Sequence, residues 1–355
     1  MTGTAHIRLP KAKSTTFAGV SLASSLYTVP LTLFLRGNLG AGKTTFLQGF
    51  AEGLGIRERL TSPTYALEQR YTVELFDPLS IHSPLPALPQ WGRCPPWGRE
   101  NIELLHIDLY RIDPKEAKDL VESSDDFQGI RCIEWSEKIS EKEKTGLHID
   151  LKFEDHKNTE RSLDIQFHDI ALPSRAQIET WRKETALLKP ICKHCDTVGR
   201  FAEKIAHTLL ERGVIVRPET VRRAGELHDL LRFLDFQNPS LDPPPVWKKW
   251  MAQYPNLKHE AACALFLREQ GFDALATIIE PHGLMFPSPK RPTIEQKVLF
   301  YADKRTIVDR VVSIDERFED FKERYGKGKV SSKHTQWYEE VCAIERELFP
   351  EGVPF

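Results

Sequence analysis

The sequence predicts an α/β domain followed by an all-α domain. Short apolar runs, separated by glycines and by helix-compatible segments, fill the first 170 residues. From Cys192 onward, apolar residues instead recur at helical spacing. With domains averaging about 150 residues, a chain of 355 residues has room for two such units. We therefore expect one domain over residues 1–171, a linker over 172–190 and a second domain over 191–355.

The first predicted unit is a buried strand followed by a glycine-rich loop and a helix. Residues 31–35 (LTLFL) form a short apolar run that suits a buried parallel strand. The run leads into a loop from Gly37 to Thr44. Residues 44–54 are compatible with a helix, which Gly55 would end.

Two further apolar runs predict two further strands. Residues 104–108 (LLHID) and 130–134 (IRCIE) are short and apolar, and each ends in a carboxylate. Residues 147–153 and 162–167 alternate polar and apolar side chains, which predicts an antiparallel pair that closes the sheet.

The stretch between Tyr71 and Leu104 is dense in proline and should be an exposed loop or insertion. Trp91 and Trp97 lie within it and could pack the insertion down or meet a partner; packing is the favoured interpretation. After Ile170 the strand pattern ends, and we expect a connecting segment with some helix that begins near Ser174.

The second domain is predicted from helical periodicity. In its first part, apolar residues repeat three and four positions apart, as one face of a helix requires. These residues are Val198, Phe201, Ala202, Ile205, Leu209 and Leu210. Ala261, Leu265, Phe266 and Leu275 repeat more loosely.

Composition excludes several classes of protein. The net charge of −2 carries no global basic field for nucleic acid or an acidic membrane. Six cysteines in so long a chain do not form the disulfide framework of a small secreted domain. Residues 1–14 lack the apolar core of a secretory signal, and residues 30–35 are far too short to span a bilayer. We expect a cytoplasmic protein with reduced thiols and no membrane contact.

The loop from Gly37 to Thr44 has the pattern of a phosphate-binding loop, a glycine and four residues followed by Gly-Lys-Thr. Glycines let successive backbone N–H groups face phosphate oxygens, and the following helix adds its positive N-terminal end. Lys43 would reach the β- and γ-phosphates, and the Thr44 hydroxyl would bind Mg²⁺. The pattern therefore predicts a nucleoside triphosphate with Mg²⁺.

The carboxylates that end two of the strands complete this prediction. Mg²⁺ prefers oxygen ligands, so a carboxylate at a nearby strand end is expected, and Asp108 fits that demand. Glu134 ends the other run and could orient or deprotonate the attacking water.

Four segments of the first domain resemble the TsaE family, the small ATPases of bacterial tRNA threonylcarbamoyladenosine synthesis. The segments are 37–45 (GNLGAGKTT), 62–65 (SPTY), 108–111 (DLYR) and 134–135 (EW), in the family's order. The resemblance spans about residues 15–170 and implies an α/β P-loop NTPase fold. The ATP-binding residues that it implies are Gly37, Asn38, Leu39, Gly40, Ala41, Gly42, Lys43, Thr44, Thr45 and Trp135.

The resemblance also implies roles for single residues. Thr64 would belong to a switch near the γ-phosphate, and Lys43 would act in catalysis. Asp108 would lie on the Mg²⁺ side together with Thr44, and Glu134 on the water side. Trp135 would lie near the nucleotide, although a buried aromatic residue beside a strand end explains it equally well.

The activity that the family resemblance implies is ATP hydrolysis that resets the TsaB–TsaD pair between cycles of modification. The target would be adenosine 37 of tRNAs, so this chain would meet tRNA only indirectly. The sequence departs from the family at two places. Asn38 stands where the family usually has aspartate, and the proline-rich stretch 72–103 is longer than the usual connection.

The second domain carries an ordered set of metal-ligand side chains. Neutral imidazole and carboxylate together suit Fe, Mn, Ni or Zn, and six such ligands can hold one or two divalent metals. Two metals can clamp a phosphate group for in-line attack. The set is His194, His228, Asp229, His259, His282 and Asp303.

This order resembles the HD-domain phosphohydrolases over about residues 190–325. The later two histidines and the segment 301–304 (YADK) resemble the YqeK-like branch, whose two-metal site cleaves dinucleoside polyphosphates. The resemblance implies a metal-dependent phosphohydrolase of nucleotides or other phosphoesters, with Asp229 as a catalytic residue as well as a metal ligand. His259 and His282 could also be ordinary structural histidines. Lys304, Arg305 and Arg232 could neutralise a substrate phosphate or be solvated surface cations.

We therefore predict a fusion of a TsaE-like ATPase with an HD phosphohydrolase. A rival interpretation makes both halves binding modules: the first senses nucleotide and gates an assembly, and the second holds a structural metal without turnover. A general nucleotide phosphatase with a degenerate ATPase is less favoured, because Lys43, Thr44, Asp108 and Glu134 are all present. His82, His106, His156 and His207 lie outside the pattern and are expected to be structural or exposed.

Overall fold

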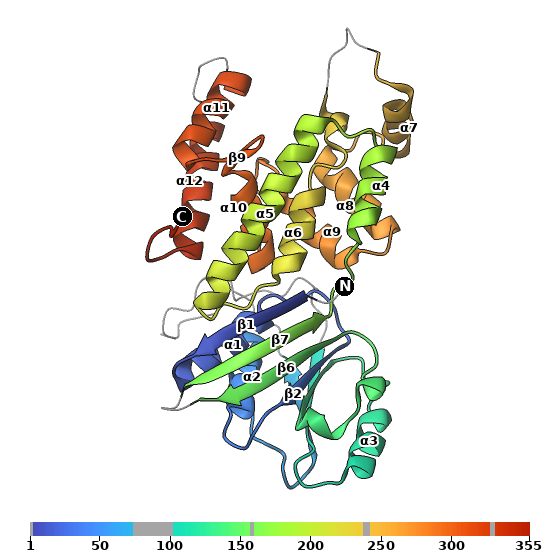
Figure 1. Cartoon of the computed structure of the whole chain (residues 1–355), viewed down its shortest axis with the longest axis vertical. Helices are drawn as coiled ribbons and strands as arrows, with labels where there is room; N and C mark the ends of the chain where they lie inside the picture. Colours follow the sequence, from blue (N-terminus) through green and yellow to red (C-terminus); the bar gives the residue numbers. More distant parts are fainter. Residues whose placement is uncertain (1–2, 74–101, 157–159, 237–241, 327–330) are drawn as a thin grey trace.

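The computed structural model describes residues 3–73, 102–156, 160–236, 242–326 and 331–355. A sheet with its helices forms the first half of the chain, and a bundle of helices lies against one side of it (Figure 1). Most of the predicted proline-rich insertion, including Trp91 and Trp97, lies outside the described residues. Its described ends are not a loop as expected, since residues 72–73 and 102–103 belong to paired strands.

The first half is built on a seven-stranded mixed sheet with the order β1-β7-β6-β2-β5-β4-β3. Pairings of β2 with β5 and β6, and of β4 with β5, are parallel, and the other three pairings are antiparallel. The strands are β1 (Gly3–Leu9), β2 (Leu31–Arg36), β3 (Glu68–Val73), β4 (Ile102–Asp108), β5 (Ile130–Glu134), β6 (His148–Asp155) and β7 (Arg161–His168).

Every strand that the sequence predicts is confirmed, including the antiparallel pair β6–β7. The structure adds β1 and β3. In β1 the buried residues Ala5, Ile7 and Leu9 alternate with more exposed ones, so a period of two was present in the sequence. β1 pairs with β7, which places it at the edge of the sheet.

Helices pack on both faces of the sheet, and β2 is therefore buried on both of its faces. Leu33 and Leu35 of β2 belong to a core that includes Phe46 of α2 (Lys43–Gly53), as well as residues of α1 (Ala12–Ala23). Phe34 points to the other face and packs in a smaller core with Val121 of α3 (Pro114–Ser123). This arrangement holds the loop after β2 in a fixed place at the centre of the sheet.

The second half consists of helices, as the sequence predicts. They are α4 (Arg175–Glu184), α5 (Lys189–Glu211), α6 (Pro218–Leu227), α7 (Pro245–Gln253), α8 (His259–Glu269), α9 (Asp273–Ile279), α10 (Ile294–Asp303), α11 (Ile314–Gly326) and α12 (Ser332–Leu348). Two short strands, β8 (Thr306–Ile307) and β9 (Arg310–Val311), form a hairpin after α10. All six periodic positions predicted on α5 are buried. Among the described residues, no helix has both the length and the apolar character that crossing a membrane requires.

The predicted connecting segment contains α4, whose N-cap is Ser174 as expected. The Ser174 hydroxyl accepts a hydrogen bond from the Gln177 backbone N–H, which satisfies a free donor of the first helical turn. Trp181 of α4 packs edge-on against Phe266, with 5.2 Å between ring centroids. The connecting helix therefore packs on the helical half.

A buried polar network joins the two halves. Arg217, immediately before α6, donates to Asp169 after β7 (2.5 Å) and to Glu295 of α10 (2.8 Å). Burial alone would lower the pKa of Arg217, but the carboxylates of Asp169 and Glu295 outweigh it and raise the pKa. The Tyr27 hydroxyl, from the first half, donates to Glu295 at 2.9 Å.

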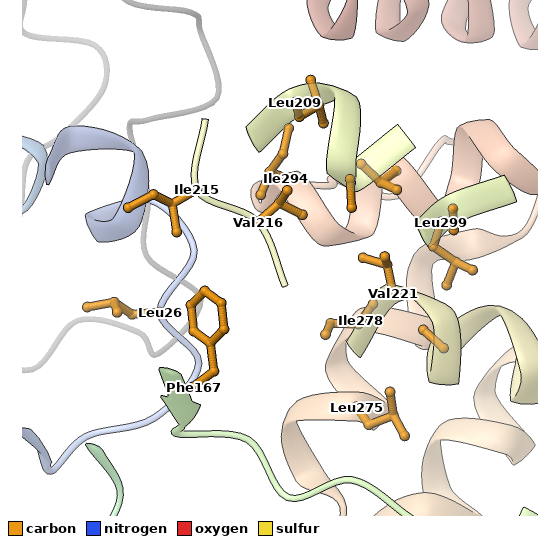
Figure 2. Close-up of a cluster of buried hydrophobic side chains, with 14 of the residues drawn as sticks. Leu26, Phe167, Leu209, Ile215, Val216, Val221, Leu275, Ile278, Ile294 and Leu299 are labelled. Atoms are coloured by element: carbon orange, nitrogen blue, oxygen red, sulfur yellow. The ribbon is translucent and has the colours of Figure 1, made fainter. Parts of the chain in front are cut away.

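Apolar side chains surround this network. Leu26 and Phe167 of the first half face Ile215 and Val216 of the second (Figure 2). All of them are buried in one core that continues across the boundary. The Ile215 N–H also donates to the Ser21 hydroxyl at 2.8 Å. The two halves therefore share packing and hydrogen bonds and are not joined by the chain alone.

Candidate nucleotide and metal sites

The predicted phosphate loop lies between the end of β2 and the start of α2. Gly40 (φ 82°) and Gly42 (φ 104°) have left-handed backbone conformations, which glycine adopts without strain. Gly42 is the N-cap residue of α2, so the loop leads directly to the N-terminal end of that helix. The local structure is thus the strand–loop–helix unit that the sequence predicts, with its free N–H groups at an anion-binding helix end.

Lys43 is buried and folds back over its own loop. Its Nζ donates to the backbone carbonyls of Gly37 (2.6 Å) and Asn38 (3.1 Å). It also lies 3.8 Å from the ring centroid of Trp135. Burial lowers the pKa of Lys43, and Glu134 opposes that change. Trp135 adopts a left-handed conformation (φ 62°), a strained state for a bulky residue that places its ring beside the loop.

The two predicted carboxylates lie side by side, because Asp108 of β4 is directly opposite Glu134 of β5. The Thr44 hydroxyl hydrogen-bonds to Glu134, at 2.9 and 3.1 Å from its two oxygens. Asp108 instead accepts hydrogen bonds from Ser62 (2.6 Å) and Thr64 (2.7 Å). The carboxylate beside the Thr44 hydroxyl is therefore Glu134, whereas the expectation grouped Asp108 with Thr44.

The contact of Thr44 with Glu134, and not with Asp108, follows from the order of strands in the sheet. β5 is the direct neighbour of β2, and β4 is one position further out. A side chain at the end of β5 is therefore nearer to the first turn of α2 than one at the end of β4. The sequence contains both strands but does not state which one pairs with β2.

His106, expected from the sequence to be structural or exposed, is fully buried on β4. Its Nε2 lies 3.0 Å from a Glu134 oxygen, so it adjoins the carboxylates of this site. His106 precedes Asp108 by two residues, so both side chains leave the same face of the strand. That spacing, read together with Asp108, was the signal that could have identified it.

Exposed apolar and aromatic side chains lie on and beside the phosphate loop, and we call them the rim of the site. Leu39 is 74% exposed and Tyr65 is 86% exposed. Tyr110 contacts the Trp135 ring, with 4.7 Å between centroids, and Arg111 lies over the Tyr65 ring. Ala41 is buried, and Thr45 on the first turn of α2 is half-buried. Among the predicted ATP-binding residues, Leu39 is therefore exposed, Trp135 and Thr45 are half-buried, and Ala41 and Lys43 are buried.

The six predicted metal ligands of the helical half come together from five separate elements. His194 lies on α5, His228 and Asp229 follow the end of α6, His259 begins α8, His282 is in a short 3₁₀ turn after α9, and Asp303 ends α10. Two ligand groups are formed, His194–His228–Asp229 and Asp229–His259–His282. Asp229 is common to both.

The distances within the cluster place the Asp229 carboxylate between two sets of imidazoles. Asp229 Oδ1 is 3.0 Å from His259 Nε2 and 3.7 Å from His282 Nε2. Asp229 Oδ2 is 3.8 Å from His228 Nε2. Asp303 Oδ1 is 3.0 Å from His194 Nε2 and 3.7 Å from His228 Nε2, which places Asp303 on the first group.

Hydrogen bonds to backbone carbonyls orient two of the histidines toward the cluster. His228 Nδ1 lies 2.8 Å from the Gly225 carbonyl, and His282 Nδ1 lies 2.7 Å from the Ile279 carbonyl. A carbonyl only accepts, so each Nδ1 carries a proton and Nε2 is the ring nitrogen that faces the cluster. His228 Nε2 is buried and has no hydrogen-bond partner among the described residues. A metal ion would satisfy it.

The charged forms within the cluster stabilise one another. Burial would raise the pKa of Asp229, but His228 and His259 outweigh it and hold that pKa well below its ordinary value. Burial lowers the pKa of His282 to about 4, so this histidine stays neutral. Asp303 likewise has a lowered pKa, because Lys304 and the neighbouring histidines outweigh the effect of burial.

The cluster lines a cavity of about 540 Å³. Its walls carry the cations Arg232, Lys258, Lys304 and Arg317, and His334 and Trp337 of α12. Lys304 and Arg232, which the sequence suggested, are therefore in place. Arg305 is not, because its guanidinium hydrogen-bonds to Tyr301, Glu345 and the Val312 carbonyl away from the cavity. Arg317 was missed, since its helix α11 follows the ligand motifs.

Comparisons with known proteins identify the first half. The model of the family "Threonylcarbamoyl adenosine biosynthesis protein TsaE" matches residues 9–83 and 93–163. The chain is 34% identical over 154 residues to the tRNA threonylcarbamoyladenosine biosynthesis protein TsaE of Nostoc sp., which covers 42% of this chain and 78% of that protein. The chain belongs to the TsaE family. The TsaE of Synechocystis sp. is 32% identical over 138 residues, 37% of this chain and 69% of that protein.

The TsaE half does not extend through the whole chain. The HD domain model matches residues 191–307, so the chain is a fusion of a TsaE domain with an HD domain. All six clustered ligands lie within the matched range. The solved structure "Crystal structure of Bacillus subtilus YdiB" is 23% identical to the chain and covers 47% of it and 88% of that protein, with a TM-score of 0.32.

Proposed function

We propose that this chain is bifunctional. Its TsaE half is the ATP-binding and ATP-hydrolysing component of tRNA threonylcarbamoyladenosine synthesis and acts with the TsaB–TsaD pair. Its HD half is a metal-dependent phosphohydrolase of nucleotides or other phosphoesters. The observation that carries the second part is the sharing of Asp229 between two ligand groups on the wall of a cavity that also carries Lys and Arg side chains.

In the TsaE half, three sets of side chains have different roles in ATP binding and hydrolysis. Lys43 leaves the carbonyls of its loop and neutralises the β- and γ-phosphates. Thr44 and Glu134 would hold Mg²⁺, and His106 would fix the Glu134 carboxylate. Asp108 and its partner Thr64 then act on the γ-phosphate side, where a switch residue that hydrogen-bonds a carboxylate can respond to hydrolysis.

The rim of the nucleotide site supports a partner at this face. Leu39 and Tyr65 are large apolar residues that are mostly exposed beside the phosphate loop. Aromatic side chains of this kind are enriched where proteins meet. A TsaB–TsaD pair that covers this rim would contact the loop and the Ser62–Thr64 switch together. Nucleotide state and partner binding would then be linked.

Substitution of the two carboxylates tests the assignment in this half. Glu134→Gln should raise the Mg²⁺ concentration needed for ATP binding roughly tenfold or more, as loss of a ligand-side carboxylate does. Asp108→Asn should leave that requirement unchanged and lower ATP turnover in the presence of TsaB–TsaD. ATP binding measured by calorimetry across a Mg²⁺ series, together with phosphate release, separates the two effects. If Asp108→Asn raised the Mg²⁺ requirement and Glu134→Gln did not, Asp108 would be the Mg²⁺ ligand and the assignment would be wrong.

In the HD half, the first ligand group and Asp303 would hold one divalent transition metal, and the second group would hold another. Such metals supply Lewis-acid polarisation of a phosphoryl oxygen and lower the pKa of bound water. The chain's own contribution is positioning. Lys304 and Arg317 present positive charge to the cavity and would bind substrate phosphate there. A cavity of about 540 Å³ accommodates a nucleotide-sized ligand.

A metal and substrate screen on the full chain tests the HD proposal. Purified Lys43→Ala protein, which lacks the competing ATPase, should contain Fe, Mn, Ni or Zn. It should release phosphate from members of a panel of nucleotides, dinucleoside polyphosphates and simple phosphomonoesters. Removal of metal by a chelator should stop the release, and re-addition should restore it. Metal-replete protein without turnover on any panel member would contradict the enzymatic assignment.

One observation favours a second function. His228, His259 and His282 are each at most 2% exposed, and enclosed ligand sets are typical of structural metals. In that case the HD half would stabilise the fold, and the whole chain would sense nucleotide and gate an assembly. Metal that binds at full stoichiometry without turnover is the outcome that this function requires.

A further inference from the structure

A third group of potential metal ligands lies on the sheet, away from both sites. His148 begins β6 and His168 ends β7, and the two residues are direct partners in the antiparallel register. Their rings stack with 4.4 Å between centroids and an interplanar angle of 15°. Asp150 follows His148 by two residues and so leaves the same face of β6. Both Nε2 atoms approach one oxygen, Asp150 Oδ2, at 3.7 Å from His148 and 3.6 Å from His168.

Hydrogen bonding leaves the His148 Nε2 lone pair unused. Its Nδ1 lies 2.9 Å from the Gly146 carbonyl, which can only accept. The proton of a neutral His148 is therefore on Nδ1, and Nε2 presents a lone pair toward Asp150. His148 and His168 both present Nε2 toward the one carboxylate of Asp150.

Only one of the two Asp150 carboxylate oxygens has a hydrogen-bond partner among the described residues. Asp150 is 3% exposed, and Lys144 donates to its Oδ1 at 2.5 Å. Oδ2 is buried and accepts no hydrogen bond from the part of the chain that the structure describes. An unsatisfied buried carboxylate oxygen is costly, because its hydration has been lost without replacement. This oxygen is the one that lies 3.7 Å from His148 Nε2 and 3.6 Å from His168 Nε2.

We propose that His148, Asp150 and His168 bind a divalent transition metal of the zinc class. One ligand atom from each residue lies within 4.8 Å of the others, a separation that a single bound cation can bridge. Two imidazoles and a carboxylate are a recognised donor set for Zn²⁺ and Fe²⁺. Zinc bonds of about 2.0–2.1 Å place tetrahedral ligands about 3.3 Å apart, close to the 3.7 and 3.6 Å between Asp150 Oδ2 and the two Nε2 atoms. Because imidazole lone pairs lie in the ring plane, the His168 ring turns out of the stack when both histidines bind one ion.

A metal bound to His148, Asp150 and His168 would lie close to the contact between the two halves of the chain. β6 runs parallel to β2, so His148, at the start of β6, lies at the opposite end of the sheet from the phosphate loop. His168 is followed by Asp169, which is bonded to Arg217 of the helical half. A bound metal would tie the ends of two strands together next to the contact between the halves. β7 ends beside the helices in Figure 1.

Metal stoichiometry of the full chain tests the proposal with Zn²⁺ alone as the probe. After equilibrium dialysis against micromolar Zn²⁺ and elemental analysis, His148→Asn/His168→Asn should bind one ion fewer per chain than the wild type. His6→Asn/His207→Asn, which changes two histidines outside every ligand group, should bind as many as the wild type. Equal stoichiometry in the wild type and the first variant would overturn the proposal.

Two measurements keep the test decisive if that variant does not fold. Wild-type crystals grown with Zn²⁺ should show an anomalous-difference peak between Nε2 of His148 and Nε2 of His168, and absence of the peak contradicts the site. Lys144→Gln should bind the ion at this site about tenfold more tightly, because a positive charge beside the shared carboxylate is removed. Unchanged or weaker binding would show that Asp150 is not a ligand.

Discussion

Asp229→Asn should remove metal from both groups of the HD half and abolish its phosphate release. Asp229 contributes to both ligand groups, so a single substitution weakens both. The neutral amide also leaves His259 and His228 without the carboxylate that faces them. Loss of a metal that supplies about 4 kcal/mol of transition-state stabilisation corresponds to roughly a 10³-fold decrease in rate. Elemental analysis and phosphate release from the best substrate of the panel measure the two effects.

Asp273→Asn is the matched control, because Asp273 is an exposed aspartate at the start of α9 in the same half. It should retain metal and activity. ATP binding should be unchanged in both variants, since the phosphate loop lies in the other half. Retention of both metals by Asp229→Asn would show that Asp229 is not the shared ligand.

Lys43→Ala should lower ATP hydrolysis by roughly 10²–10³-fold, because the cation that meets the transferred phosphoryl charge is lost. ATP binding should weaken as well, since the ammonium contacts the β- and γ-phosphates in the ground state. Phosphate release in the presence of the TsaB–TsaD pair and a binding isotherm for ATP would measure the two losses separately.

The control for this substitution is Lys13→Ala, an exposed lysine on α1. It should hydrolyse ATP at the rate of the wild type. HD-dependent phosphate release should be equal in the wild type, Lys43→Ala and Lys13→Ala if the two sites act independently. Undiminished ATP hydrolysis by Lys43→Ala would exclude the phosphate loop as the site of that reaction.

The strand–loop–helix unit was predictable because it is local. The loop needs glycines at positions with left-handed backbone, a lysine and a threonine at fixed spacing, and a strand before it, and all of these are adjacent in the chain. The buried face of α5 was predictable for the same reason, because helical periodicity depends on neighbours three and four residues apart. The ligand set of the HD half was also visible, because its residues follow a recognisable order.

The partners of Asp108 and Glu134 were not predictable in the same way. Which carboxylate lies beside Thr44 depends on the order of strands in the sheet, and strand order is a long-range property. His106 was overlooked because its contact with Glu134 crosses from β4 to β5. The stacked pair His148–His168 is formed by strand register.

By itself, the sequence determined the fold class and the phosphate loop, which are encoded in spacing along single segments where backbone geometry alone relates the residues. The order of His and Asp residues in the helical half also predicted the six that cluster there, although they come from five separate elements. Only the tertiary structure decided that Glu134 contacts Thr44, that Asp229 is shared by two ligand groups, and that Arg217 joins the halves through Asp169 and Glu295. Each of these contacts joins residues that are distant in the chain, and packing of the whole core is what brings them within hydrogen-bonding distance.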